Sequence, residues 1–103
     1  MKTFDINSIQ AFPFSEREKN LFYKAEEFKM RIIELATGQE LPDCEMKSHV
    51  IFFLIKGNVE TTVNMEKTIL TEGQLLVSEP ANFSMKALEA SRLLGIQINK
   101  KNL

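Results

Sequence analysis

The stretch GQELPDCEMKSHVIFFLIKG, residues 38–57, begins and ends with a glycine. Between the two glycines, Cys44, Met46 and Val50 stand at spacings where a metal-binding segment would carry ligands. The first two offer a thiol and a thioether, and the third has no donor atom. The stretch therefore has the spacing of a metal site without the imidazole and carboxylate groups that commonly fill one.

Residues 50–57, VIFFLIKG, are typical of a buried strand that ends at a turn, where Gly57 and Asn58 can supply positive φ. Short apolar or alternating segments continue on both sides and are separated by turn residues. These segments are 21–25, 28–36, 59–65, 68–70, 74–78, 83–87 and 91–98, with a turn expected at Glu66 and Lys67. Short strands at this spacing predict an all-β sandwich or barrel.

The segment FKMRIIELA contains good helix formers, but its flanking turn and its pair of isoleucines favour a strand. In a strand, one face carries Phe28, Met30 and Ile32. The opposite face carries Lys29 and Arg31.

Composition limits the classes of partner. The chain has 103 residues and a formal net charge of −1. One domain is the default at this length.

The charge balance lacks the positive surplus that nucleic acid or an anionic membrane requires, so we expect neither as a partner. No apolar run could span a bilayer, no signal peptide is visible, and a single cysteine cannot form an internal disulfide. These features predict a cytoplasmic protein.

Residues 38–57 resemble the first conserved motif of the cupin family, in which two histidines and a glutamate lie between two glycines. All spacings agree, and Cys44, Met46 and Val50 stand at the three ligand positions. The second cupin motif is matched more loosely, with one additional residue before its proline, by Gly73, Pro80, Met85 and Glu89.

The resemblance covers about residues 21–98 and implies a small double-stranded β-helix, or jelly-roll barrel. We expect residues 1–20 to form an irregular N-terminal arm and residues 21–103 to form a single cupin-like barrel domain. Ser15 and Glu18 have the spacing of a helix cap, but a plain polar connection is the preferred interpretation.

Phe12 and Phe14 flank Pro13 and are expected to hold the arm against the barrel or against a second subunit. Barrels of this size leave sheet edges that must be covered. Small single-domain cupins also commonly pair, so we expect a homodimer.

The resemblance places the metal of the family at Cys44, Met46, Val50 and Met85. Valine coordinates nothing, and sulfur ligands suit copper(I) rather than iron, manganese, nickel or zinc. We therefore expect no metal and no other cofactor.

Three interpretations of Cys44, Met46 and Met85 remain open. The preferred one is apolar filling inside a barrel that has lost its metal. The second is a dry, methionine-lined pocket for a small apolar or flat ligand. The third is a soft-metal site, which would need converging ligands and a deprotonated thiol.

If the motif sets Val50 inward, strand periodicity places Phe52 and Leu54 in the barrel interior as well. Phe53 and Ile55 then face the other way and need a cover, either the arm or a second subunit. The sole histidine, His49, should point outward and away from Ser48, so the two form no catalytic dyad.

No catalytic residue is predicted, and a non-enzyme is favoured. The preferred function is metal-independent binding or sensing of a small apolar ligand inside the barrel. The alternatives are a metal-dependent cupin enzyme with soft ligands and a structural or interaction protein without a ligand. The predicted ligand pocket consists of Cys44, Met46, Val50, Phe52 and Met85.

Overall fold

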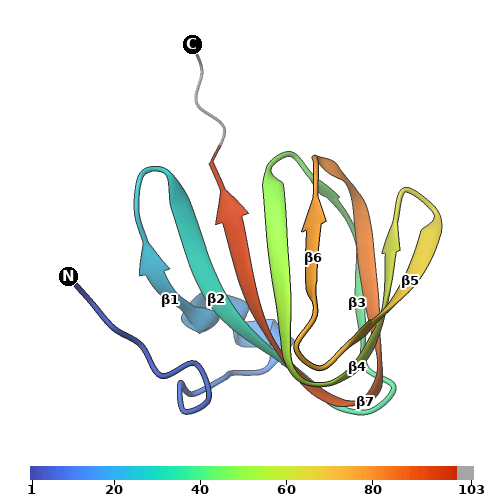
Figure 1. Cartoon of the computed structure of the whole chain (residues 1–103), viewed down its shortest axis with the longest axis horizontal. Coiled ribbons are helices and arrows are strands. Elements are labelled where there is room, and N and C mark those ends of the chain that lie inside the picture. Colours follow the sequence, from blue (N-terminus) through green and yellow to red (C-terminus); the bar gives the residue numbers. More distant parts are fainter. Residues whose placement is uncertain (100–103) are drawn as a thin grey trace.

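A computed structural model describes residues 1–99; the last four residues of the predicted 21–103 domain lie outside it. Within the described part, one short 3₁₀ helix precedes seven strands, and every strand pairing is antiparallel (Figure 1). The elements are η1 (Phe14–Asn20), β1 (Leu21–Lys24), β2 (Phe28–Leu35), β3 (Glu40–Met46), β4 (His49–Val63), β5 (Glu66–Thr71), β6 (Leu75–Ser78) and β7 (Ala81–Ile98).

Two long strands, β4 and β7, pair with each other along most of their length and run through both halves of the barrel (Figure 1). In one half, β2 pairs with residues 91–98 of β7 and β6 pairs with residues 50–53 of β4. In the other half, β3 pairs with β7 and β5 pairs with β4. The predicted all-β jelly-roll barrel is confirmed.

The turn predicted at Gly57 and Asn58 is wrong, because β4 continues through both residues. Gly57 has φ 107°, and the register against β7 shifts around it, so the strand bends at a bulge. The hydroxyl of Ser91 accepts the N–H of Asn58 at 3.0 Å and donates to the carbonyl of Glu89 at 2.7 Å. The Ser91 hydroxyl thus bonds backbone groups of both strands where their register shifts. The chain bends at Gly57 but does not reverse direction.

Other boundaries also differ from the sequence prediction. The segments predicted separately at 83–87 and 91–98 are one bent strand, β7, and residues 40–46 form the unpredicted strand β3. The turn expected at Glu66 and Lys67 lies two residues earlier, because Asn64 and Met65 adopt φ 48° and 71° and connect β4 to β5. Two consecutive positive φ angles suit a two-residue hairpin loop.

The predicted register of β4 is confirmed. Val50, Phe52 and Leu54 belong to the barrel core, with exposed fractions of 2%, 8% and 0%. Phe53 and Ile55 point to the other face and are half-buried.

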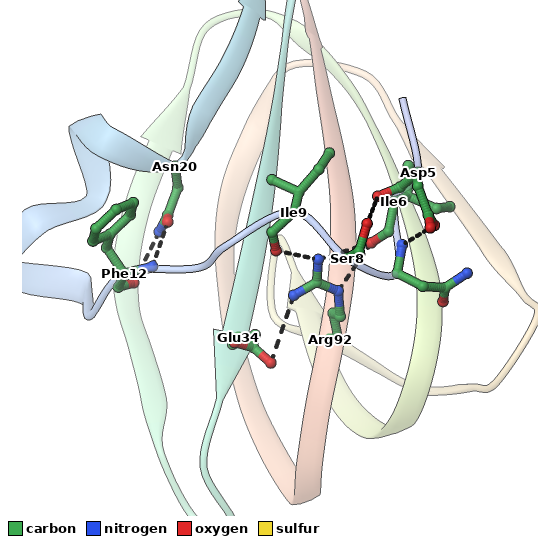
Figure 2. A network of polar contacts seen from close by, with 9 residues as sticks. Asp5, Ile6, Ser8, Ile9, Phe12, Asn20, Glu34 and Arg92 are labelled. Carbon is green, nitrogen blue, oxygen red and sulfur yellow. Dashed lines mark hydrogen bonds and ion pairs between the residues drawn. The ribbon is translucent and has the colours of Figure 1, made fainter. Parts of the chain in front are cut away.

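The strand β2 carries apolar residues on both faces. Leu35 belongs to the barrel core and Ile33 packs against it. Ile32, on the opposite face, is nevertheless fully buried. Figure 2 shows the N-terminal arm crossing β2 and β7 on the side of Glu34 and Arg92. Ile32 lies on that same face, because it is two residues from Glu34 on β2. The barrel thus has an inner core and a second apolar layer beneath the arm.

One side chain holds the arm in place (Figure 2). The guanidinium of Arg92 donates hydrogen bonds to the carbonyls of Ile6 and Ile9, and its Nη1 lies 3.6 Å from Oε2 of Glu34. Because hydrogen bonds from a charged donor are stronger than neutral ones, Arg92 fixes a segment that has no strand partners of its own.

The C-terminal part of the arm is also ordered. The side-chain amide of the buried Asn20 bonds both the N–H and the carbonyl of Phe12. The plain connection preferred from the sequence is wrong, because residues 14–20 are the 3₁₀ helix η1. The alternative, a cap formed by Ser15 and Glu18, is absent too: Pro13 precedes η1, and no side chain caps it. Among residues 1–99, no helix is long and apolar enough to cross a bilayer.

Replacement of Gly57 by alanine should destabilise the fold by about 3 kcal/mol or more. The new Cβ would lie 2.2 Å from Oγ of Ser91 and 2.6 Å from the carbonyl oxygen of Ala90, at a φ that disfavours a side chain. Gly73→Ala is the matched control: its φ is 85° and no atom lies within 4 Å of the added Cβ, so it should cost only about 1–2 kcal/mol. Urea unfolding measures both, and equal losses would contradict the role of the bulge.

Candidate functional site

An open cavity of about 370 Å³ extends from the core residues of the barrel outward to η1. Residues of β2, β3, β4 and β7 form its wall, and Phe14 and Arg17 of η1 contribute from outside the sheet. The structure brings all five residues of the sequence-predicted pocket to this one cavity: Cys44, Met46, Val50, Phe52 and Met85. Residues distant in sequence thus share a surface, because β3, β4 and β7 enclose the same space.

The five residues differ in depth. Val50, Phe52 and Met85 are buried, Met46 is half-buried and Cys44 is exposed. The thiol sulfur of Cys44 lies 3.9 Å from the thioether sulfur of Met46. The deep wall is therefore apolar and the two sulfurs lie closer to its opening.

Local irregularity in β3 positions the sulfur residues. Leu41 pairs with Met85 and Cys44 pairs with Phe83, so β3 has two residues where β7 has one. This bulge contains Pro42, which has no N–H to donate and is tolerated in a strand that pairs on one side only.

Polar groups on the wall are few. They belong to Arg17, Arg31, Asp43, Cys44, Ser84 and Gln97. Such a wall, mainly apolar with a few polar groups, is typical of small-molecule sites.

The sequence analysis missed Arg31 as a cavity residue. It pairs with Gly95 of β7, and it shares a strand face with the inward residues Ile33 and Leu35. A Cβ added to Gly95 would lie 3.2 Å from the ring of Phe52 and 3.5 Å from Cγ of Arg31, so the glycine leaves room for both side chains. The sequence did contain a sign that Arg31 could face the interior. Both faces of β2 carry apolar residues, so neither face is expected to be fully exposed to solvent.

No protein-family model matches the sequence, and no curated protein matches it. Solved structures do match. A cupin superfamily protein from Desulfitobacterium hafniense has a TM-score of 0.72 at 12% identity, over 78% of this chain and 74% of that one. A conserved protein of unknown function from Streptococcus pyogenes has a TM-score of 0.71 at 20% identity, over 77% and 70%.

The Cnp3 cupin domain of Schizosaccharomyces pombe has a TM-score of 0.69 at 24% identity, over 78% of this chain and 61% of that one. At these identities the likeness concerns the fold. Together with the jelly-roll topology, it shows that the chain has the cupin fold.

The metal that the cupin resemblance implies does not fit these residues. The positions expected to hold it carry sulfur or no donor atom, namely Cys44, Met46, Val50 and Met85. Within residues 1–99, no group of three or more histidine, cysteine, aspartate or glutamate side chains is placed to bind a metal. His49 is exposed, as its position beside the inward Val50 predicts.

Restoring donors at the four positions should create a metal site. We expect the variant Cys44→His, Met46→His, Val50→Glu, Met85→His to melt at a lower temperature than the parent, because it buries unpaired polar groups at about 1–3 kcal/mol each. Zinc or nickel should recover its stability by binding the folded state.

The control replaces Lys86 instead of Met85 by histidine in the same variant, because Lys86 is exposed on the opposite face of β7. This version should gain less from metal. A folded four-residue variant that gains no more from metal than the parent would show that the four positions do not converge.

Proposed function

We propose that this protein binds or senses a small molecule inside the barrel without a metal. The observation that supports this most directly is the cavity of about 370 Å³, whose wall contains the five predicted pocket residues. Its volume falls in the range of about 300–1,000 Å³ that ligand sites commonly have. A deep wall of Val50, Phe52, Phe83 and Met85 favours the apolar part of a ligand.

The second candidate is a metal-dependent enzyme with soft ligands. The 3.9 Å approach of the Cys44 and Met46 sulfurs is the observation in its favour, since a thiolate and a thioether suit copper(I). Elemental analysis of protein purified without chelator distinguishes the two. Copper at one atom per chain would support the second candidate, and zinc, iron, manganese or nickel at that level would contradict the absence of a metal.

Binding can be tested with a neutral apolar fluorophore, N-phenyl-1-naphthylamine, whose emission rises in a dry environment. We expect the parent protein to bind it and Met46→Trp, which fills the cavity, to bind it about tenfold more weakly, a loss of about 1.4 kcal/mol. Glu45→Trp is the matched control, because Glu45 neighbours Met46 on β3 but is exposed and does not line the cavity. A parent that binds no probe would favour the remaining alternative, a structural or interaction protein.

The homodimer and the cytoplasmic location expected from the sequence remain predictions. For the dimer we propose a contact surface on the outside of β6 and the adjoining part of β4. There Leu75 and Val77 are 62% and 67% exposed, and their neighbours Ile51 and Phe53 are half-buried. A second copy is the occupant proposed, because an uncharged apolar face is complementary to itself across a two-fold axis. Pairing would also cover β6, which bonds to β4 on one side only.

Val77→Glu should convert the dimer to a monomer, because it places a charge in the centre of this contact surface. Light scattering at high micromolar concentration measures the mass. Met65→Glu is the control, since Met65 is 94% exposed on the loop between β4 and β5. A parent that is already monomeric at this concentration would contradict the dimer.

A further inference from the structure

We propose that the ligand of the barrel is a small organic acid, whose carboxylate is bound by Arg31 and whose apolar part occupies the deep wall. This inference rests on the proposed function and adds the chemical class of the ligand.

The position of Arg31 inside the barrel is determined by strand register. Its neighbour on β2, Ile33, pairs with the buried core residue Leu93, and Arg31 itself pairs with Gly95. The absence of a side chain at Gly95 leaves room for both the aliphatic part of Arg31 and the ring of Phe52. The residue is half-buried, and it lines the same cavity as the apolar residues.

Arg31 has no acidic partner within residues 1–99. The ion pairs of this part of the chain join Lys19 to Glu16, Lys67 to Glu60 and Arg92 to Glu34. Arg92 differs from Arg31 in this respect. It lies on the outside of the barrel, where two backbone carbonyls accept its hydrogen bonds and a carboxylate lies nearby. A guanidinium cannot lose its charge at physiological pH, so a half-buried one favours an anion beside it.

A second cation lines the same cavity. Arg17 of η1 stacks on the ring of Phe14, with its Cζ 4.5 Å from the ring centroid, and both residues contribute to the wall. Asp43 is the one carboxylate on the wall within the described residues, so the wall carries two guanidinium groups against one carboxylate. The remaining positive charge favours a monoanion.

The rest of the wall distinguishes a carboxylate with an apolar body from a bare anion. Phe52 and Phe83 lie with ring centroids 5.1 Å apart, and Met85 is buried among the same core residues. A free phosphate would gain nothing from these groups, whereas a flat or aromatic acid would contact them and place its carboxylate at the planar fork of Arg31.

The test compares two probes of similar shape, 2-naphthoate and 2-naphthylmethanol, by calorimetry on the full-length protein. We expect the parent to bind the acid at least about tenfold more tightly than the alcohol. Arg31→Met should abolish this preference and still bind the alcohol. Arg31→Lys should keep part of the preference, because it retains the charge without the fork.

Lys29→Met is the matched control, since Lys29 lies two residues away on β2 and does not line the cavity. Its preference for the acid should equal that of the parent, and melting curves should show that every variant is folded. Inorganic phosphate should not compete with the acid.

Each contrary outcome has a distinct meaning. Equal affinity for the two probes in the parent, or a preference that persists in Arg31→Met, would overturn the role of Arg31 while leaving the binding function intact. Competition by phosphate would overturn the ligand class. Failure of the parent to bind either probe would overturn the proposed function as well.

Discussion

The antiparallel pairing of β4 with β7 is the constraint on which the rest of the structure depends. Their pairing runs from His49 opposite Ile98 to Val63 opposite Phe83, and every other strand except β1 bonds to one of the two. Both strands must bend to serve both halves of the barrel. They do so at Gly57, where only a residue without a side chain avoids the backbone of Ser91.

In the half of the barrel that contains β2 and β6, the strands carry apolar residues on their outer face as well as on the inner one, and a helix or a second sheet would cover such a face in other folds. Inside, the core residues of β4 and β7 pack around the cavity. Outside, Ile32 is fully buried on the face that the arm crosses, and Arg92 holds the arm through its carbonyls. The outward residues of β6 have no such cover within the described chain, and we propose this face for the contact with a second copy.

The cavity lies in a barrel of cupin fold, but its wall lacks the metal ligands that the family resemblance implies. Residues that the resemblance identifies as ligand positions still meet on one wall, but they present sulfur and aliphatic carbon instead of imidazole and carboxylate. Such a wall favours contact with an apolar molecule over coordination of a hard metal ion. Arg31 also lines this wall, and we propose it as the directed polar group of the site.

The sequence by itself determined the spacing from Gly38 to Gly57, the looser second motif that contains Met85 and the two-residue alternation of β4. These were sufficient to predict the fold class and five residues that line the cavity. Both are local properties, because a strand alternates its side chains whatever surrounds it. Only the tertiary structure decided that β4 passes through Gly57, that residues 14–20 are helical and that Arg31 points inward. Two of these depend on a partner distant in sequence, namely Ser91 beside Gly57 and Gly95 opposite Arg31. The helix at residues 14–20 is accompanied by a more local contact, the side chain of Asn20 bonded to Phe12. On a strand with two apolar faces, periodicity separates the faces but cannot say which one the barrel encloses.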